Sequence, residues 1–311
     1  MESNEQIYAM SRSWLAILAV LGACALPFAV HGAGVAMVTD LQGKATMAAE
    51  GRPRDVTILA ELEAGAQVQL AAGATLVALY LDAGDEYVFK GPAAIVFKAG
   101  QPDVTSGAKP EKRSSSLGKG GNTIRIKPVG MAQGAMVMRG FRTGARIQLL
   151  NLHKTRTLET QPEFRWQELQ AGVKYQLEIT DETGRAMHEA EIDVPSFKLP
   201  ASVVLKEGVP YTWEVSARLA DGRKYSSSAD FALAPAALRT QAEALRPAAT
   251  APLSSRITYA AWLDQMELKD EARKYWKTAS AERPDDPRLR ALAEQQRRCA
   301  PAYIDCREGG P

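Results

Sequence analysis

The residue types that most often carry catalysis or bind metals are few in this chain and show no recognised spacing. It has three histidines, His31, His153 and His188, and none stands in a zinc-site or catalytic pattern. Neither a G-x-S-x-G elbow nor an H-E-x-x-H motif is present. Carboxylates are abundant but scattered, so a catalytic pair could form only in the tertiary structure. We therefore expect no catalytic residue, no metal site, no cofactor and no enzyme activity.

An apolar run near the N-terminus has the order of a secretory signal. Arg12 precedes the run, Trp14 to Val30 carry no charge, and small residues follow at positions 32–34. The run is at the short limit for a membrane span and contains Pro27. We expect cleavage of this segment and a periplasmic protein, with a retained signal anchor as the alternative.

Two details of this segment leave alternatives open. A start at Met10 removes Glu2 and Glu5, which weaken the positive charge before the apolar run. Leu21-Gly22-Ala23-Cys24 resembles a bacterial lipobox, which would make Cys24 a lipidation candidate, although the apolar run continues beyond it. Membrane contact is expected only if Cys24 is lipidated or the signal stays uncleaved.

Cys299 and Cys306 lie seven residues apart near the C-terminus. In an oxidising compartment, and with Cys24 removed, they are the one pair that can form a disulfide. A loop this short would stabilise the protein by roughly 2 kcal/mol. The alternative, a redox pair, favours the closer C-x-x-C spacing. We predict a structural disulfide.

The composition is that of an ordinary globular protein and limits the classes of partner. The chain has 311 residues, of which 46% are hydrophobic and 24% charged. Its 38 Lys and Arg residues nearly balance 36 Asp and Glu residues. A nucleic-acid-binding protein usually has a larger basic excess, so we expect no nucleic-acid partner.

The first part of the exported chain has the pattern of an all-β domain. Short apolar runs alternate with Gly-containing turns, and no helical segment separates them. Residues Thr75 to Leu81 are apolar on both faces, as in a central strand. Gly43 with its short strand, and the segment from Leu62 to Phe97, resemble the FecR domain of bacterial envelope proteins. The resemblance implies an envelope β-domain. Control of a sigma factor is not implied, because the cytoplasmic region of FecR regulators has no counterpart before the apolar run.

A basic, Ser- and Gly-rich stretch at 106–121 is predicted to be an exposed loop. It contains the candidates for contact with an anionic surface or polymer, which are Lys109, Lys112, Arg113 and Lys119. A solvated loop is the simpler interpretation. Gly118-Lys119 is no phosphate-binding loop, because Arg113 occupies the position of the first glycine.

A second β-module follows, with clean alternation of apolar and polar residues in 175–180 and 211–219. The segment Pro162 to Trp166, the alternating strands and the closing Phe231 resemble a fibronectin type III domain, a fold that by itself implies no activity. Trp166 and Trp213 could be ligand platforms, but the regular alternation around them predicts core positions.

The C-terminal part is predicted to be helical. Ser254 or Ser255 is expected to cap one helix, and Asp286 with Pro287 to begin the last. The small-large-small order of the segment 260–284 resembles a tetratricopeptide repeat, which usually needs neighbours for stability. Trp276 shares a helical face with Ala272 and Ala279 and is predicted to lie in the core.

Tyr259 and Trp262 are the candidates for contact with a partner. Trp262 is adjacent to Leu263, so we expect it to point away from the core direction of that residue. If it does, Trp262→Ala should cost less stability than Trp276→Ala and should weaken partner capture.

The sequence thus predicts a multidomain, mainly β protein with a C-terminal helical hairpin region. Its expected divisions are a signal peptide at 1–33, a FecR-like β-sandwich or roll at 35–140, a fibronectin type III-like β-sandwich at 146–233, an Ala/Pro-rich linker with a short helix at 234–253, tetratricopeptide-like helices at 254–298 and a tail at 299–311. We expect a non-catalytic binding, scaffold or signalling module of the bacterial envelope with a protein partner. The alternative is a carbohydrate- or polymer-binding component of an envelope polysaccharide system, for which a basic patch with exposed aromatic residues would be the sign.

Overall fold

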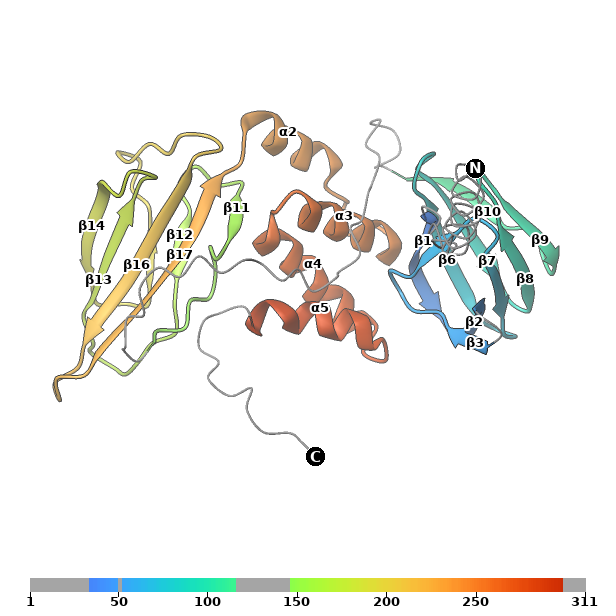
Figure 1. The fold of residues 1–311 in the computed structure, drawn as a ribbon, viewed down its shortest axis with the longest axis horizontal. Coiled ribbons are helices and arrows are strands. Elements are labelled where there is room, and N and C mark those ends of the chain that lie inside the picture. Colours follow the sequence, from blue (N-terminus) through green and yellow to red (C-terminus); the bar gives the residue numbers. More distant parts are fainter. Residues whose placement is uncertain (1–33, 50–51, 116–145, 299–311) are drawn as a thin grey trace, which may run out of the picture. The chain divides into compact units, whose positions relative to one another are not determined.

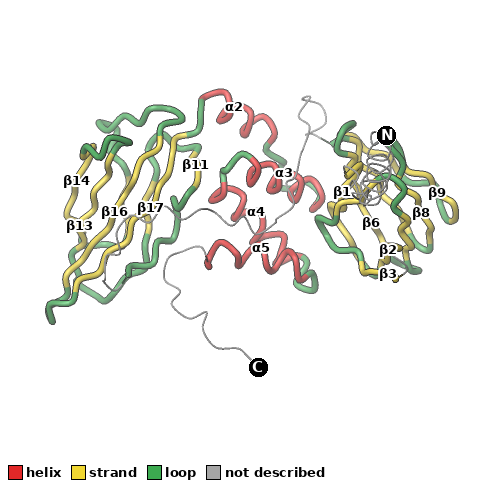
Figure 2. Tube along the Cα trace, in the orientation of Figure 1, coloured by secondary structure: helices red, strands yellow, loops and turns green. Residues whose placement is uncertain are grey.

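The computed structural model describes residues 34–49, 52–115 and 146–298. This part of the chain is mainly β, with antiparallel sheets followed by four short helices (Figure 1). Figure 2 shows the same division, with strands along most of the described chain and helices only after β17. The predicted fold class is therefore confirmed at this level.

The first sandwich, residues 34–115, consists of two five-stranded antiparallel sheets. One sheet has the order β10-β7-β6-β1-β4 and the other β3-β2-β5-β8-β9. The ten strands are β1 (Gly34–Gln42), β2 (Ala45–Ala49), β3 (Arg52–Asp55), β4 (Glu61–Glu63), β5 (Gln67–Leu70), β6 (Thr75–Tyr80), β7 (Asp85–Lys90), β8 (Ala93–Phe97), β9 (Pro102–Ser106) and β10 (Glu111–Ser114). Gly43 makes the tight β1–β2 turn with φ of +79°, where a Cβ would lie 3.0 Å from the Ala74 Cα.

The core of the first sandwich lies between its sheets. Aromatic side chains from both sheets meet there, with Tyr80 and Phe89 each in ring contact with Phe97. β6 is the middle strand of its sheet, as its apolar character on both faces predicts. Ala78 and Tyr80 face this core, whereas Leu79 belongs to a second core shared with the helices. The apolar outer face of β6 therefore has a partner within the chain.

The second sandwich, residues 146–233, has a five-stranded sheet in the order β11-β17-β16-β13-β14 and a two-stranded sheet of β12 and β15. Its strands are β11 (Thr155–Thr157), β12 (Glu163–Arg165), β13 (Tyr175–Thr180), β14 (Ala186–Ile192), β15 (Ser196–Lys198), β16 (Pro210–Arg218) and β17 (Lys224–Leu233). The pairings between its named strands are antiparallel except that of β11 with β17, and an isolated parallel bridge joins Glu207 to Leu233. The segment before β11 also forms an isolated antiparallel bridge from Leu149 to Trp166, the residue that follows β12.

Trp166 and Trp213 occupy the core of the second sandwich, as predicted, with 1% and 0% of their surface exposed. Polar tips of core residues bond to the backbone. Trp213 Nε1 donates to the Leu152 carbonyl at 2.9 Å, and the Tyr211 hydroxyl accepts from the Lys206 amide at 2.8 Å. These bonds tie the loops on either side to the sheet.

Four helices follow: α2 (Ala236–Leu245), α3 (Leu253–Gln265), α4 (Lys269–Glu282) and α5 (Pro287–Arg298). The predicted short helix of the linker is α2. At α5 the Asp286 carboxylate accepts from the amides of Arg288 and Leu289, as the Asp-Pro pattern predicts. The predicted serine cap is wrong, because α3 begins at Leu253 after Pro252, and Ser254 lies inside its first turn. Trp276, Ala272 and Ala279 form the buried face of α4, as expected.

Candidate functional site

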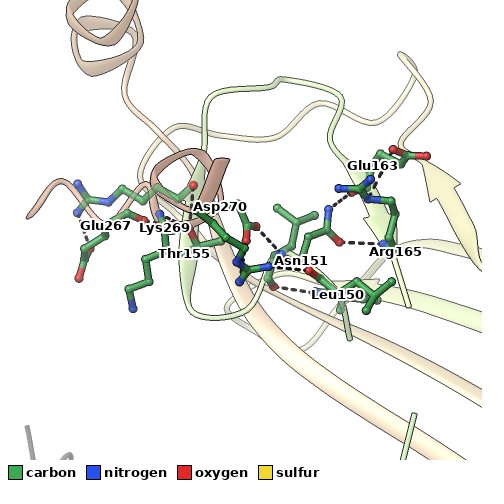
Figure 3. A network of polar contacts seen from close by, with 12 residues as sticks. Leu150, Asn151, Thr155, Glu163, Arg165, Glu267, Lys269 and Asp270 are labelled. Carbon is green, nitrogen blue, oxygen red and sulfur yellow. Dashed lines mark hydrogen bonds and ion pairs between the residues drawn. The ribbon is translucent and has the colours of Figure 1, made fainter. Parts of the chain in front are cut away.

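A polar junction joins α4 to the segment that leads into β11 (Figure 3). Asp270, in the first turn of α4, accepts a hydrogen bond from the Leu152 amide at 2.7 Å. Arg273, one turn later, donates to the Leu150 carbonyl at 2.8 Å and lies 3.3 Å from Asp270. The helix thus provides hydrogen-bond partners for two backbone groups of the loop before β11, the Leu152 amide and the Leu150 carbonyl.

Thr155 connects the same segment to the N-terminus of α4. Its hydroxyl accepts from the Lys269 amide and donates to the Glu267 carbonyl, both at 3.0 Å. The residue at the N-cap position, Leu268, has no side-chain oxygen, so the first turn of α4 needs an acceptor from elsewhere. Thr155 supplies that acceptor from 114 residues earlier in the sequence.

Asn151 joins this loop to β12. Its side chain donates to the Glu163 carbonyl at 2.6 Å and accepts from the Arg165 amide at 2.8 Å. Leu152 and Lys154 nearby have φ of 52° and 47°, a left-handed conformation that costs energy for residues other than glycine. Bonds from both sides hold this conformation in place.

Next to the junction is an open cleft of about 520 Å³. One side comes from residues 148–167 of the second sandwich and the other from the exposed face of α4. Its charged lining residues are Arg156, Glu159, Glu163, Arg165, Asp270, Glu271, Arg273, Lys274 and Lys277. Several are paired with each other or with nearby residues, including Lys274 with Glu271 at 2.8 Å and Arg156 with Glu267 at 3.3 Å.

The lining favours ligands held by hydrogen bonds and ion pairs. Gln148 and Gln167 add side-chain amides, which both donate and accept. None of the described residues that line the cleft is aromatic, so stacking on a flat ring is not available there. Beside the junction, burial lowers the pKa of His153, and the positive charges of Lys154 and Lys269 lower it further.

The predicted basic loop is partly a strand, which corrects one expectation. Residues 111–114 form β10 and pair with β7, so only part of the stretch 106–121 is a loop. Lys109 is exposed. Lys112 forms an ion pair with Asp85 at 2.7 Å, and Arg113 bonds to both oxygens of Glu111. Lys119 lies outside the described residues.

The expected outward orientation of Trp262 is wrong in the structure, and Tyr259, the other candidate for partner contact, is also buried. They are 2% and 3% exposed and belong to the core that the helices share with Met37 and Leu79 of the first sandwich. The Tyr259 hydroxyl donates to the Ala242 carbonyl at 2.7 Å. The sequence argument failed because α3 is surrounded: α2, α4 and β1 all contact it, so adjacent residues on different faces are buried.

Cys24, Cys299 and Cys306 lie outside the described residues, so their predicted roles stay predictions. Among residues 34–49, 52–115 and 146–298, no group of His, Cys, Asp or Glu side chains is arranged to hold a metal ion. The helices within these ranges also include none long and apolar enough to cross a membrane.

The residues that build the junction were missed by sequence reasoning. An aspartate in the first turn of a helix is usually explained by the helix dipole, so Asp270 carries no sign of a distant partner. Asn151 and Thr155 lie in a polar stretch with no periodicity. Their roles depend on contacts between segments far apart in the chain.

Comparison with known proteins gives no family. No protein-family model matches the chain, and no curated protein matches it. Solved structures with some likeness include CopC from Methylosinus trichosporium OB3b, at 18% identity and a TM-score of 0.22, over 29% of this chain and 96% of CopC.

Two further structures are similarly distant. A tetra-tandem repeat in the extending region of a large adhesion protein has 15% identity and a TM-score of 0.21, over 65% of this chain and 42% of that one. PorZ, a surface component of the type-IX secretion system of Porphyromonas gingivalis, has 15% identity and a TM-score of 0.21, over 61% of this chain and 25% of PorZ. None of these likenesses carries a functional argument.

Proposed function

We propose that this protein is an exported, non-catalytic binding and scaffold module of the bacterial envelope that holds its partner in the cleft beside α4. The observation that carries the proposal is the cleft itself, whose walls are fixed by hydrogen bonds. Asp270 and Arg273 of α4 bond to the loop before β11, and Thr155 of β11 accepts from the Lys269 amide of α4. A fixed polar cleft loses little conformational entropy when it binds a ligand.

The arrangement of the strands supports the family resemblances in this proposal. In the second sandwich, β12 pairs with β15 and the order β11-β17-β16-β13-β14 forms the other sheet, and this arrangement supports the resemblance to a fibronectin type III domain. Tyr211, at the start of β16, bonds back to the Lys206 amide in the manner of a tyrosine corner. In the first sandwich, Gly43 and the buried strands β6 and β7 support the FecR-like assignment.

Export is tested by the mass of the mature chain. Intact-mass measurement should show a protein that starts near Ala33 or Gly34, and thiol labelling under denaturing, non-reducing conditions should find neither Cys299 nor Cys306 free. A diacylglyceryl group on Cys24 would show that the protein is a lipoprotein. A full-length chain would show that the signal segment is retained as an anchor. Two reactive thiols would exclude the structural disulfide.

The binding site is tested by photo-crosslinking in intact cells. A crosslinking amino acid at Lys277, on the exposed α4 side of the cleft, should give an adduct that Arg165→Glu, on the opposite side, abolishes. The same probe at Lys224, an exposed residue that does not line the cleft, is the matched control. Equal adducts at both positions, or an adduct insensitive to Arg165→Glu, would reject the cleft as the site.

The polymer-binding alternative is favoured by one observation, the side-chain amides of Gln148 and Gln167 beside paired charges, which suit the hydroxyl groups of a sugar. The same crosslinked adduct distinguishes a protein ligand from a polysaccharide ligand. Protease digestion that releases a partner peptide supports a protein ligand, whereas a glycosidase-sensitive adduct supports a polysaccharide.

A further inference from the structure

In the first sandwich, the outer face of the sheet β10-β7-β6-β1-β4 is covered by α3. Met37 of β1 and Leu79 of β6 belong to the same buried core as Ile257, Ala260 and other residues of α3. On an antiparallel sheet, Glu86 of β7 is paired in register with Leu79 and therefore points to the same face. A carboxyl group thus lies beside the apolar residues through which the sheet and α3 pack.

Glu86 is only 4% exposed and incompletely bonded. Its Oε2 accepts from the Ser254 hydroxyl of α3 at 3.3 Å, and its Oε1 has no hydrogen-bond partner among the described residues. Ser254 is itself 2% exposed. A buried carboxylate with one free oxygen is costly, whereas the neutral carboxylic acid loses much less hydration on burial.

The charged groups around Glu86 do not compensate its burial. On β10, Arg113 is its register partner and favours the ionised form, but Arg113 is bonded to Glu111 through two nitrogens. On β1, Asp40 repels a charge on Glu86, and Asp40 is in turn paired with Arg283 after α4. From β6 the facing residue is Leu79, and from α3 it is the uncharged Ser254.

We propose that Glu86 makes the contact between the first sandwich and α3 sensitive to pH, so that the contact is firm while this carboxyl is protonated and opens more often once it is ionised. Opening lets water reach the carboxylate, which removes the cost of holding a charge at an apolar contact. The helices would then be a pH-dependent cover on the outer face of β1, β6 and β7.

The direction of the effect follows from the pKa. Burial, the largest cause, raises the pKa of Glu86 above its usual 4.5, partly offset by the Ser254 hydroxyl and Arg113. A raised pKa means that the covered state binds a proton more tightly than the open state. The stabilisation of the covered state is therefore complete below about pH 4.5 and is lost as the pH rises through the raised pKa of Glu86. Over that range the equilibrium constant for opening rises by up to about tenfold per pH unit.

Hydrogen exchange of α3 amides in the full chain between pH 4.5 and 8, divided by the intrinsic exchange rates, tests the proposal. We expect the equilibrium constant for opening to rise with pH in the wild type, severalfold relative to Glu86→Gln, whose side chain keeps its size but cannot ionise. Asp264 on α3 is present in both proteins, so its own titration cancels in this ratio. Amides of β13, in the second sandwich, provide an internal reference that should not change with Glu86→Gln.

Two further variants make the test specific. Ser254→Ala removes the hydrogen bond that favours the carboxylate, so the rise should move to higher pH. Glu63→Gln changes an exposed glutamate of β4 in the same sheet and should follow the wild type. A ratio of wild type to Glu86→Gln that stays constant with pH, or a pH dependence unmoved by Ser254→Ala, would overturn the proposal.

Discussion

Arg283, the residue that follows α4, donates to both carboxylate oxygens of Asp40 on β1, at 3.2 and 3.0 Å. The two residues are 243 positions apart in the sequence, and their side chains are 25% and 13% exposed. Like the hydrogen bond between Glu86 and Ser254, this pair links the first sandwich to the helices. A bidentate, partly buried ion pair is stronger than an exposed one and fixes the direction of approach.

Breaking this pair should destabilise the contact between β1 and the helices. We expect a double-mutant cycle of Asp40→Ala and Arg283→Ala to give a coupling free energy of roughly 1–3 kcal/mol in urea denaturation. The exposed pair Lys98 and Asp103, at 2.6 Å in the first sandwich, is the control and should give less than about 1 kcal/mol. Equal coupling in both cycles would mean that Asp40 and Arg283 act only as surface charges.

The two tryptophans of the helices should be equally important for stability. Trp276 is 1% exposed and Trp262 is 3% exposed, both in one core. Either residue changed to alanine should lower the free energy of unfolding by about 3–5 kcal/mol, because a large cavity remains. This revises the expectation that Trp262→Ala costs less. A loss below about 1 kcal/mol for Trp262→Ala would restore the view that its ring serves a partner.

The buried contact between Asp264 and Trp276 should make the stability depend on pH. Trp276 Nε1 donates to Asp264 at 2.6 Å, and burial raises the pKa of this carboxyl from 3.8 to about 6 despite that bond. The folded protein therefore holds this proton more tightly than the unfolded chain. Its stabilising effect is present below about pH 3.8 and is lost as the pH rises through about 6.

Asp264→Asn tests this dependence, because asparagine can still accept from Trp276 but does not ionise. Relative to the wild type, the variant should gain stability between pH 4 and 7, by about 1–3 kcal/mol at the upper end. Thermal unfolding across this range measures the difference. A difference that does not vary with pH would show that Asp264 is ionised throughout.

Asp270 should stabilise the junction with the second sandwich. Asp270→Ala leaves the Leu152 amide without its acceptor and removes an ion-pair contact of Arg273, so we expect a loss of about 1–3 kcal/mol. Glu271→Ala is the matched control, since Glu271 lies in the same helical turn but pairs with the exposed Lys274. Its cost should stay below about 1 kcal/mol in urea denaturation. A similar loss for both would assign the effect to the helix dipole.

Local patterns in the sequence determined the elements and their faces. Alternation in 175–180 predicted β13, the Asp286-Pro287 pair predicted the start of α5, and the stripe of Ala272, Trp276 and Ala279 predicted the buried face of α4. Trp166 and Trp213 were placed correctly in the core for the same reason. These features depend on periodicity and on capping, which act within a few residues and can be recognised in a single sequence.

The sites where modules meet were decided by the tertiary structure alone. The apolar outer face of β6 predicted burial but could not identify α3 as its cover, and the neighbours Trp262 and Leu263 gave no sign that both would be buried. Asp40 with Arg283, Glu86 with Ser254 and Thr155 with Lys269 join segments more than 100 residues apart. An isolated polar residue has the same local pattern whether it contacts water or a distant segment. Its partner is set by how the sheets and helices pack, because only packing removes the water with which that residue would otherwise form its hydrogen bonds.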